Sequence, residues 1–240
     1  MLKRRKFVAA LMTFVLALVM NFTITAPVQS KAAEIPKASN QKNMIASTVD
    51  LTADNDNLIV SDVLTYDELC KKYAESEDIS VKQAKSILDS EKSSLKAAAP
   101  AYSAAAARAA SSTYREIATY LDVSSNYKPM IKWYCQTSES GSFWGITNIL
   151  TTQLYREYSY WDWLTPVTIT KQFSGNLYTQ LQSAYQIFYI VNGDFWDYGT
   201  TTVSGGGSIN IGQYAQLQFG VSYASNWYKY YYYTDVKSVQ

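Results

Sequence analysis

The stretch Gly205–Tyr233, GGGSINIGQYAQLQFGVSYASNWYKYYYY, decides how the rest of the chain is interpreted. Between residues 215 and 223, apolar side chains occupy every second position, with Gln, Gly and Ser between them. A period of two is typical of a half-buried strand. Ser225-Asn226 interrupts the pattern and an aromatic run follows. The stretch therefore predicts two strands joined by a turn, with an aromatic face packed against a second sheet.

The first 32 residues have the organisation of a secretory signal peptide. Four basic residues at positions 3–6 precede an apolar run, Phe7–Met20, and small residues at Ser30 and Ala32 allow cleavage after Ala32. A helix of about 14 residues spans only about 21 Å of a hydrocarbon core of about 30 Å, which disfavours a transmembrane anchor. The sequence therefore predicts a secreted, extracellular protein.

Loss of this segment changes the charge of the chain. The 240 residues carry 21 basic and 20 acidic side chains, and five of the basic ones precede residue 34, which leaves a net charge of −4. An acidic chain lacks the electrostatic footprint of a nucleic-acid binder, so we expect no nucleic-acid partner. The chain contains no His, which excludes His-based catalytic triads and His-ligated zinc. We expect no metal site and no cofactor.

The chain has two cysteines, Cys70 and Cys135. In an exported protein an even count is compatible with a disulfide. Cys70 lies in a segment expected to be helical. Cys135 lies in an expected strand, residues 130–137, whose alternation places Ile131, Trp133 and Cys135 on one face. The spacing of the two cysteines alone does not decide whether they pair. Two alternatives stay open, a Cys70–Cys135 bridge or two unbridged thiols that pack as small buried residues.

The N-terminal half is expected to contain a helical hairpin between two linkers. Residues 33–64 are polar and predict a disordered linker. Capping boxes at Thr65–Glu68 and Ser80–Gln83 predict two helices within residues 65–96. We interpret this hairpin as a propeptide or spacer, and a helical appendage packed on the main domain is the alternative. Residues 97–112 are rich in Ala and Ser and predict a second linker with a processing site.

Residues 113–240 form the expected main domain. From residue 112 onwards the chain holds 18 of its 21 Tyr and all six Trp. Asn192-Gly193 lies between an apolar run and an aromatic run and predicts a type I′ hairpin turn, whereas Leu177–Ala184 is compatible with a helical turn. Roughly eight short strands without βαβ alternation predict an all-β fold, and we favour an antiparallel β-sandwich over a closed barrel.

Aromatic side chains provide the candidate binding site. Flat rings stack on the C–H faces of sugars, and Tyr and Trp also carry a polar group at the ring edge. The candidate binding residues are Trp161, Trp163, Trp196, Trp227, Tyr228, Tyr230 and Tyr232. In a strand, alternate rings of the run Trp227–Tyr233 must point away from the core, which gives an exposed aromatic row. The alternative is that the same rings fill the core and cover its rim.

These patterns lead to three hypotheses about function. The first is a secreted, non-enzymatic binding protein that engages extracellular glycan, the cell wall or another surface partner through the aromatic surface. The second is a secreted membrane-active protein, toxin-like or bacteriocin-like, with residues 33–111 as its propeptide. The third is a carboxylate-dependent glycoside hydrolase that uses Asp162, Asp194 or Asp197 as acid and base. We found no convincing catalytic motif, so we assign no catalytic residue.

Overall fold

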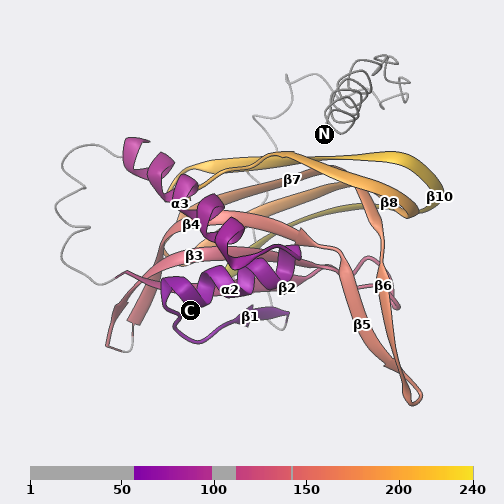
Figure 1. The fold of residues 1–240 in the computed structure, drawn as a ribbon, viewed down its shortest axis with the longest axis horizontal. Helices are drawn as coiled ribbons and strands as arrows, with labels where there is room; N and C mark the ends of the chain where they lie inside the picture. Colours follow the sequence, from indigo (N-terminus) through magenta and orange to yellow (C-terminus); the bar gives the residue numbers. More distant parts are fainter. Residues whose placement is uncertain (1–56, 99–111, 142, 240) are drawn as a thin grey trace, which may run out of the picture. The chain divides into compact units, whose positions relative to one another are not determined.

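A computed structural model of the chain describes residues 57–98, 112–141 and 143–239. These residues belong to a compact unit that spans Val49–Gln240. Strands dominate the described chain and every pairing between them is antiparallel, which confirms the predicted all-β class (Figure 1). The predicted signal peptide, residues 1–32, lies outside the described residues.

The first sheet has five strands in the order β1-β2-β3-β4-β9. Its strands are β1 (Leu58–Val60), β2 (Thr113–Tyr120), β3 (Met130–Ser140), β4 (Phe143–Tyr155) and β9 (Ile209–Asn210). Alternation along β3 sends Ile131, Trp133 and Cys135 to one core, as predicted, and Tyr134 to the opposite face. β1 lies within the predicted linker of residues 33–64, and that prediction is wrong at its end because three apolar residues add an edge strand to β2.

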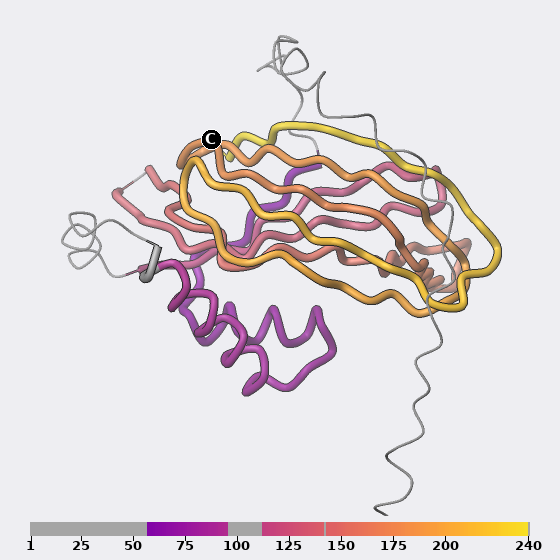
Figure 2. Tube along the Cα trace, turned by 90° about the horizontal axis from the view of Figure 1, so that it is seen from above, coloured from indigo at the N-terminus to yellow at the C-terminus, as the bar shows by residue number. Residues whose placement is uncertain are grey.

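The second sheet is built from β7 (Gln172–Ser183), β8 (Gln186–Gly205) and β10 (Tyr214–Ser238). β8 and β10 form one long ladder. The start of β10 also pairs with β7, through the edge of β10 that faces away from β8. β7 in turn pairs with β8, so the three strands form a closed, barrel-like sheet. Figure 2 shows the long strands turning back at one end of the unit.

Side chains from both sheets meet in one hydrophobic core. Trp133 of β3 lies with its ring centroid 5.5 Å from that of Tyr189 on β8, and its indole Nε1 donates to Thr179 Oγ1 of β7 at 3.3 Å. The ring centroids of Phe173 and Phe195 lie 4.8 Å apart within the second sheet. Burial of each such side chain stabilises the fold by about 1.5–3 kcal/mol, so this shared core fixes the two sheets to one another.

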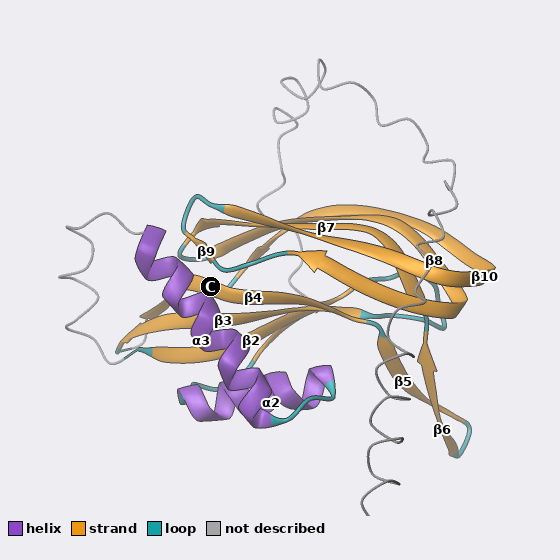
Figure 3. Ribbon diagram, turned by 45° about the horizontal axis from the view of Figure 1, so that its top comes forward, coloured by secondary structure: helices purple, strands orange, loops and turns teal. Residues whose placement is uncertain are grey.

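Two helices, α2 (Tyr66–Glu77) and α3 (Val81–Ala98), cover the outer face of the first sheet (Figure 3). The capping box predicted at Thr65 is present. Leu69 and Leu88 are buried in a second cluster together with Tyr134 and Leu150 of the sheet, so the hairpin is a packed layer. The predicted processing region falls mostly on residues 99–111, outside the described residues. No helix in the described part of the chain is long and apolar enough to cross a membrane.

The turn predicted at Ser225-Asn226 is wrong, because β10 runs through it as one strand. Its register shifts between Ser222 and Ser225, where β10 has one more residue than β8 and forms a β-bulge. Tyr223 and Asn226 have positive φ values of 55° and 53°. A polar interruption in an alternating run therefore marks a bulge here, and the strand continues beyond it.

The hairpin turn predicted at Asn192-Gly193 is also wrong, because both residues lie inside β8. Gly193 faces Gly175 of β7 across the ladder. A Cβ at Gly193 would collide with the carbonyl oxygen of Ser174 and would lie 2.7 Å from Phe173 Cζ. The glycine is needed for close approach of two strands.

The segment Leu177–Ala184 is not a helical turn, since its first seven residues complete β7. Leu177 and Leu181 are both buried in the core. A spacing of four residues places side chains on one face of a helix and also on one face of a strand, so the pattern fitted both.

β5 (Glu157–Asp162) and β6 (Thr165–Thr170) form a separate two-stranded sheet. This ribbon leaves the two larger sheets between β4 and β7 and extends away from them (Figures 1 and 3). Tyr158 and Ile169 pack against the core, so only the base of the ribbon is anchored.

Candidate functional site

The outer face of the second sheet carries polar and aromatic side chains that alternate with the core residues. We call this surface the polar-aromatic face. It consists of Gln172, Ser174, Asn176, Tyr178 and Gln180 on β7, Phe188, Ile190, Asn192, Asp194 and Trp196 on β8, and Tyr214, Gln216, Gln218, Trp227, Tyr230 and Tyr232 on β10. Because β10 flanks the pair β7–β8 on both sides, residues from both halves of β10 join one surface.

Hydrogen bonds between strands orient two exposed rings of this face. Trp227 Nε1 donates to Asp194 Oδ1 at 2.8 Å, and Tyr230 Oη donates to Asn192 Oδ1 at 2.8 Å. Both bonds run from β10 to β8. An oriented ring loses less rotamer freedom when it binds a ligand than a ring that moves freely.

Further hydrogen bonds connect β7 with its two neighbours. Trp196 Nε1 donates to Ser174 Oγ at 3.0 Å, and Gln216 Nε2 donates to Asn176 Oδ1 at 2.8 Å. Each amide retains hydrogen-bonding groups that these contacts do not use. The surface is therefore fixed in conformation and still able to bond a ligand.

A second aromatic group lies toward the other end of the face. The Tyr178 ring stacks on Tyr214 at a centroid distance of 5.2 Å and meets Phe188 edge-on at 6.0 Å. Burial, with a smaller effect of Tyr214, raises the pKa of Tyr178. Like an ordinary tyrosine hydroxyl, that of Tyr178 is protonated at neutral pH and can donate a hydrogen bond.

The face is exposed and nearly free of charge. Trp227, Tyr230 and Tyr232 expose 57%, 51% and 47% of their surface. Asp194 is the only charged side chain among the residues that define the face. Stacking rings, amides and hydroxyls suit a neutral polyhydroxylated ligand, whereas an anionic polymer would need Lys or Arg.

The structure brings together four of the seven predicted binding residues, Trp196, Trp227, Tyr230 and Tyr232. Tyr228 is not among them, because it turns toward the core side. Its Oη lies 2.6 Å from Ser124 Oγ, and Lys171 Nζ lies 3.7 Å above its ring. The alternative of a packed ring is therefore the correct one for this residue.

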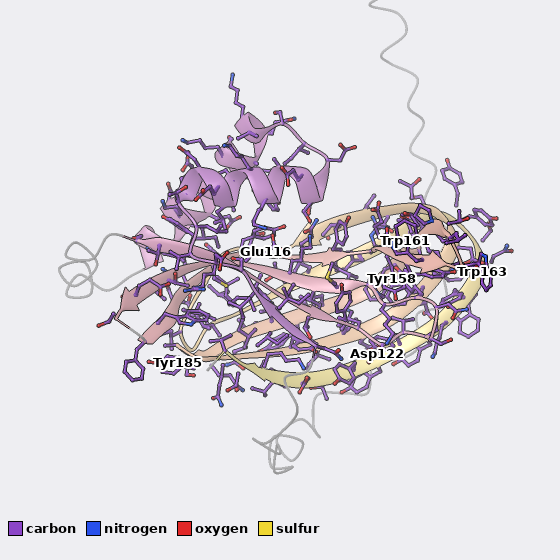
Figure 4. The ribbon with its side chains drawn as sticks, turned by 90° about the horizontal axis from the view of Figure 1, so that it is seen from below. Glu116, Asp122, Tyr158, Trp161, Trp163 and Tyr185 are labelled. Atoms are coloured by element: carbon purple, nitrogen blue, oxygen red, sulfur yellow. The ribbon has the colours of Figure 1, made fainter. Side chains whose placement is uncertain are left out.

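Trp161 and Trp163 lie elsewhere, at the tip of the β5–β6 ribbon. Figure 4 places both at one end of the unit, opposite the end that carries Tyr185. Because β5 and β6 form a two-stranded sheet of their own, these two rings are not part of the polar-aromatic face.

Sequence reasoning missed three aromatic members of the face, Tyr178, Phe188 and Tyr214. The available signal was the alternation of polar and apolar residues along residues 172–181, which the helical spacing of Leu177 and Leu181 obscured. That β7 lies between β8 and the start of β10 follows from pairing distant in sequence.

The three carboxylates considered for catalysis lie in different surroundings. Asp194 accepts the hydrogen bond from Trp227, and Asp197 forms an ion pair with Lys171 at 2.6 Å. Asp162 lies in the last pair of the β5–β6 ribbon. Within the described residues, no group of three or more His, Cys, Asp and Glu could hold a metal ion.

The two cysteines are free and buried, in different clusters. Of the two alternatives left open by the sequence, the unbridged one is present. Burial raises the pKa of both thiols, most strongly for Cys135. Both side chains therefore act as small core residues at neutral pH.

Comparison with known proteins gives no relative, since no protein-family model, curated protein or solved structure matches the chain. The geometry of the polar-aromatic face is therefore the main indication of function.

Proposed function

We propose that the protein is a secreted, non-enzymatic β-sandwich protein that binds neutral glycan at a cell surface or in the extracellular matrix through the polar-aromatic face. The extracellular location rests on the signal-peptide pattern of residues 1–32. The observation that carries the proposal is the pair of exposed rings, Trp227 and Tyr230, each oriented by a hydrogen bond that it donates to the neighbouring strand.

Both chemical requirements for sugar binding are met on this face. Exposed rings offer flat apolar surface to sugar C–H groups, and Asn and Gln side chains offer both donors and acceptors to hydroxyl groups. Along a strand, Tyr230 and Tyr232 repeat at about 6.7 Å, and neighbouring strands repeat at about 4.8 Å. Such a surface can follow an extended polymer over several sugar units.

The test is adsorption of the chain from Ala33 onwards to insoluble neutral polysaccharides, namely cellulose, chitin and a β-glucan. We expect saturable binding to at least one of them. The double variant W227A/Y230A should weaken that binding about 30-fold, because two central aromatic residues together contribute about 2 kcal/mol.

The matched control is F143A, which removes an exposed ring at the β3–β4 turn, outside the face. It should bind as the unmodified protein does. Equal binding by W227A/Y230A and F143A, or binding only to anionic polymers such as teichoic acid, would refute the proposal.

A further inference from the structure

The tip of the β5–β6 ribbon exposes three large apolar side chains within four residues. Trp161, Trp163 and Leu164 expose 74%, 93% and 80% of their surface. Trp163 has a positive φ of 58°, which places it in the turn between the strands. Contiguous apolar exposure of this kind marks an interaction site in a soluble domain.

The ribbon is a self-contained unit. Its strands form six residue pairs, from Glu157–Thr170 at the base to Asp162–Thr165 at the tip. It extends away from the two larger sheets (Figures 1 and 3), so its tip can meet a surface before the rest of the unit does. Among the described strands, none pairs with the outer edge of β5 or β6, so the backbone groups at these edges need water or lipid headgroups.

Two cations fix the base of the ribbon at its two junctions. Arg156 lies between β4 and β5, and its Nη1 donates to Gln172 Oε1 at 2.7 Å and to Thr201 Oγ1 at 2.9 Å. Lys171 lies between β6 and β7 and pairs with Asp197 at 2.6 Å. The tip is therefore presented in a fixed direction, which lowers the entropic cost of docking.

The ribbon carries only negative charge, which disfavours an anionic partner. Residues 157–170 contain two acidic side chains, Glu157 and Asp162, and no basic one. An anionic membrane would repel such a tip. Indole rings favour the interface between water and hydrocarbon, where no complementary groove is required.

We propose that the β5–β6 tip docks on a zwitterionic lipid bilayer, with Trp161, Trp163 and Leu164 inserted to the depth of the headgroups. The unpaired strand edges limit the insertion to that depth. This lipid contact is separate from the glycan site, because the polar-aromatic face lies on other strands. A second copy of the chain and a protein groove are the competing occupants.

The experiment is flotation of the chain from Ala33 onwards with phosphatidylcholine vesicles. This chain contains the whole compact unit Val49–Gln240. We expect the protein to float with the vesicles, and lipids brominated near the headgroup should quench part of its Trp fluorescence. The variant W161A/W163A should have a vesicle partition coefficient lower by about tenfold or more, because most of the apolar area of the tip is removed. It should also lose the quenching.

The control F143A removes an exposed ring from another hairpin turn and should float as the unmodified protein does. Added phosphatidylserine should not increase the binding, and added salt should not abolish it. The proposal fails if W161A/W163A floats like F143A, or if only phosphatidylserine vesicles bind. It also fails if the protein dimerises in the absence of vesicles and W161A/W163A abolishes the dimer, since the tip would then bind a second copy of the chain.

Discussion

Trp227 and Asp194 are joined by a 2.8 Å hydrogen bond from indole Nε1 to carboxylate Oδ1, which runs from β10 to β8 on the outer face of the second sheet. The bond orients the Trp227 ring and engages the only charge of the polar-aromatic face. It links two residues that are 33 positions apart in the sequence. The bond is therefore a product of the fold that sequence reasoning could not supply.

The first prediction concerns this bond. D194A should weaken adsorption to the bound neutral polysaccharide about fivefold, because the freed indole loses its orientation at a cost of about 1 kcal/mol. Isothermal depletion assays would measure the change. D122N removes an exposed carboxylate that pairs with Lys128 outside the face and should leave binding unchanged. Equal effects of the two variants would contradict an orienting role for Asp194.

The second prediction tests the close approach of β7 and β8. G193A should destabilise the protein by about 3 kcal/mol, because the added methyl group collides with the Ser174 carbonyl. A loss of this size lowers the melting temperature by roughly 6–12 °C in a unit of this length. G220A meets only the Thr202 hydroxyl, at 3.2 Å, and should be milder. Calorimetry that ranks the two variants the other way would contradict the close approach of β7 and β8 at Gly193.

The third prediction asks whether the helices unfold together with the sheets. Leu88 is fully buried on α3, whereas its neighbour Ile87 is 40% exposed. L88A should destabilise the unit by about 3 kcal/mol and I87A by less than about 0.5 kcal/mol. All six Trp lie in the sheets or the ribbon, so urea unfolding followed by Trp fluorescence reports on them alone. If L88A leaves that transition unmoved, the helices are an independent spacer.

The fourth prediction concerns the thiols. Cys70 and Cys135 are buried and unbridged, and burial raises the pKa of both. Neither should react with a thiol reagent at neutral pH, and both should react after unfolding in urea without reductant. Intact mass after alkylation counts the labelled thiols. If both cysteines resist labelling in urea and are labelled only after reduction, they form a disulfide, which would contradict the structure.

Part of the fold follows directly from the sequence. Alternation along β3 identified the core face of Ile131, Trp133 and Cys135, and the Thr65–Glu68 pair identified the start of α2. Both signals are local, because side-chain period and capping depend on residues close in the chain. Breaks in the pattern were misleading at Asn192-Gly193 and Ser225-Asn226, since a turn, a bulge and a close strand contact use the same small polar residues.

The candidate site was predictable only in part. The run Trp227–Tyr233 identified Tyr230 and Tyr232 as outward-facing rings, because alternate side chains of a strand share a face. The partners of these rings were not predictable, because two register shifts along the β8–β10 ladder decide which residues face each other. Trp161 and Trp163 were grouped with the face by composition alone, and the structure assigns them to the ribbon tip.

The most direct test of the glycan-binding account is hydroxyl-radical footprinting of the protein, free and adsorbed on the polysaccharide it binds best. The account predicts protection of Trp227, Tyr230, Tyr232 and Tyr214, which belong to one face, and unchanged reactivity of Phe143. Protection confined to other surfaces, with Trp227 and Tyr230 as reactive as in the free protein, would contradict it.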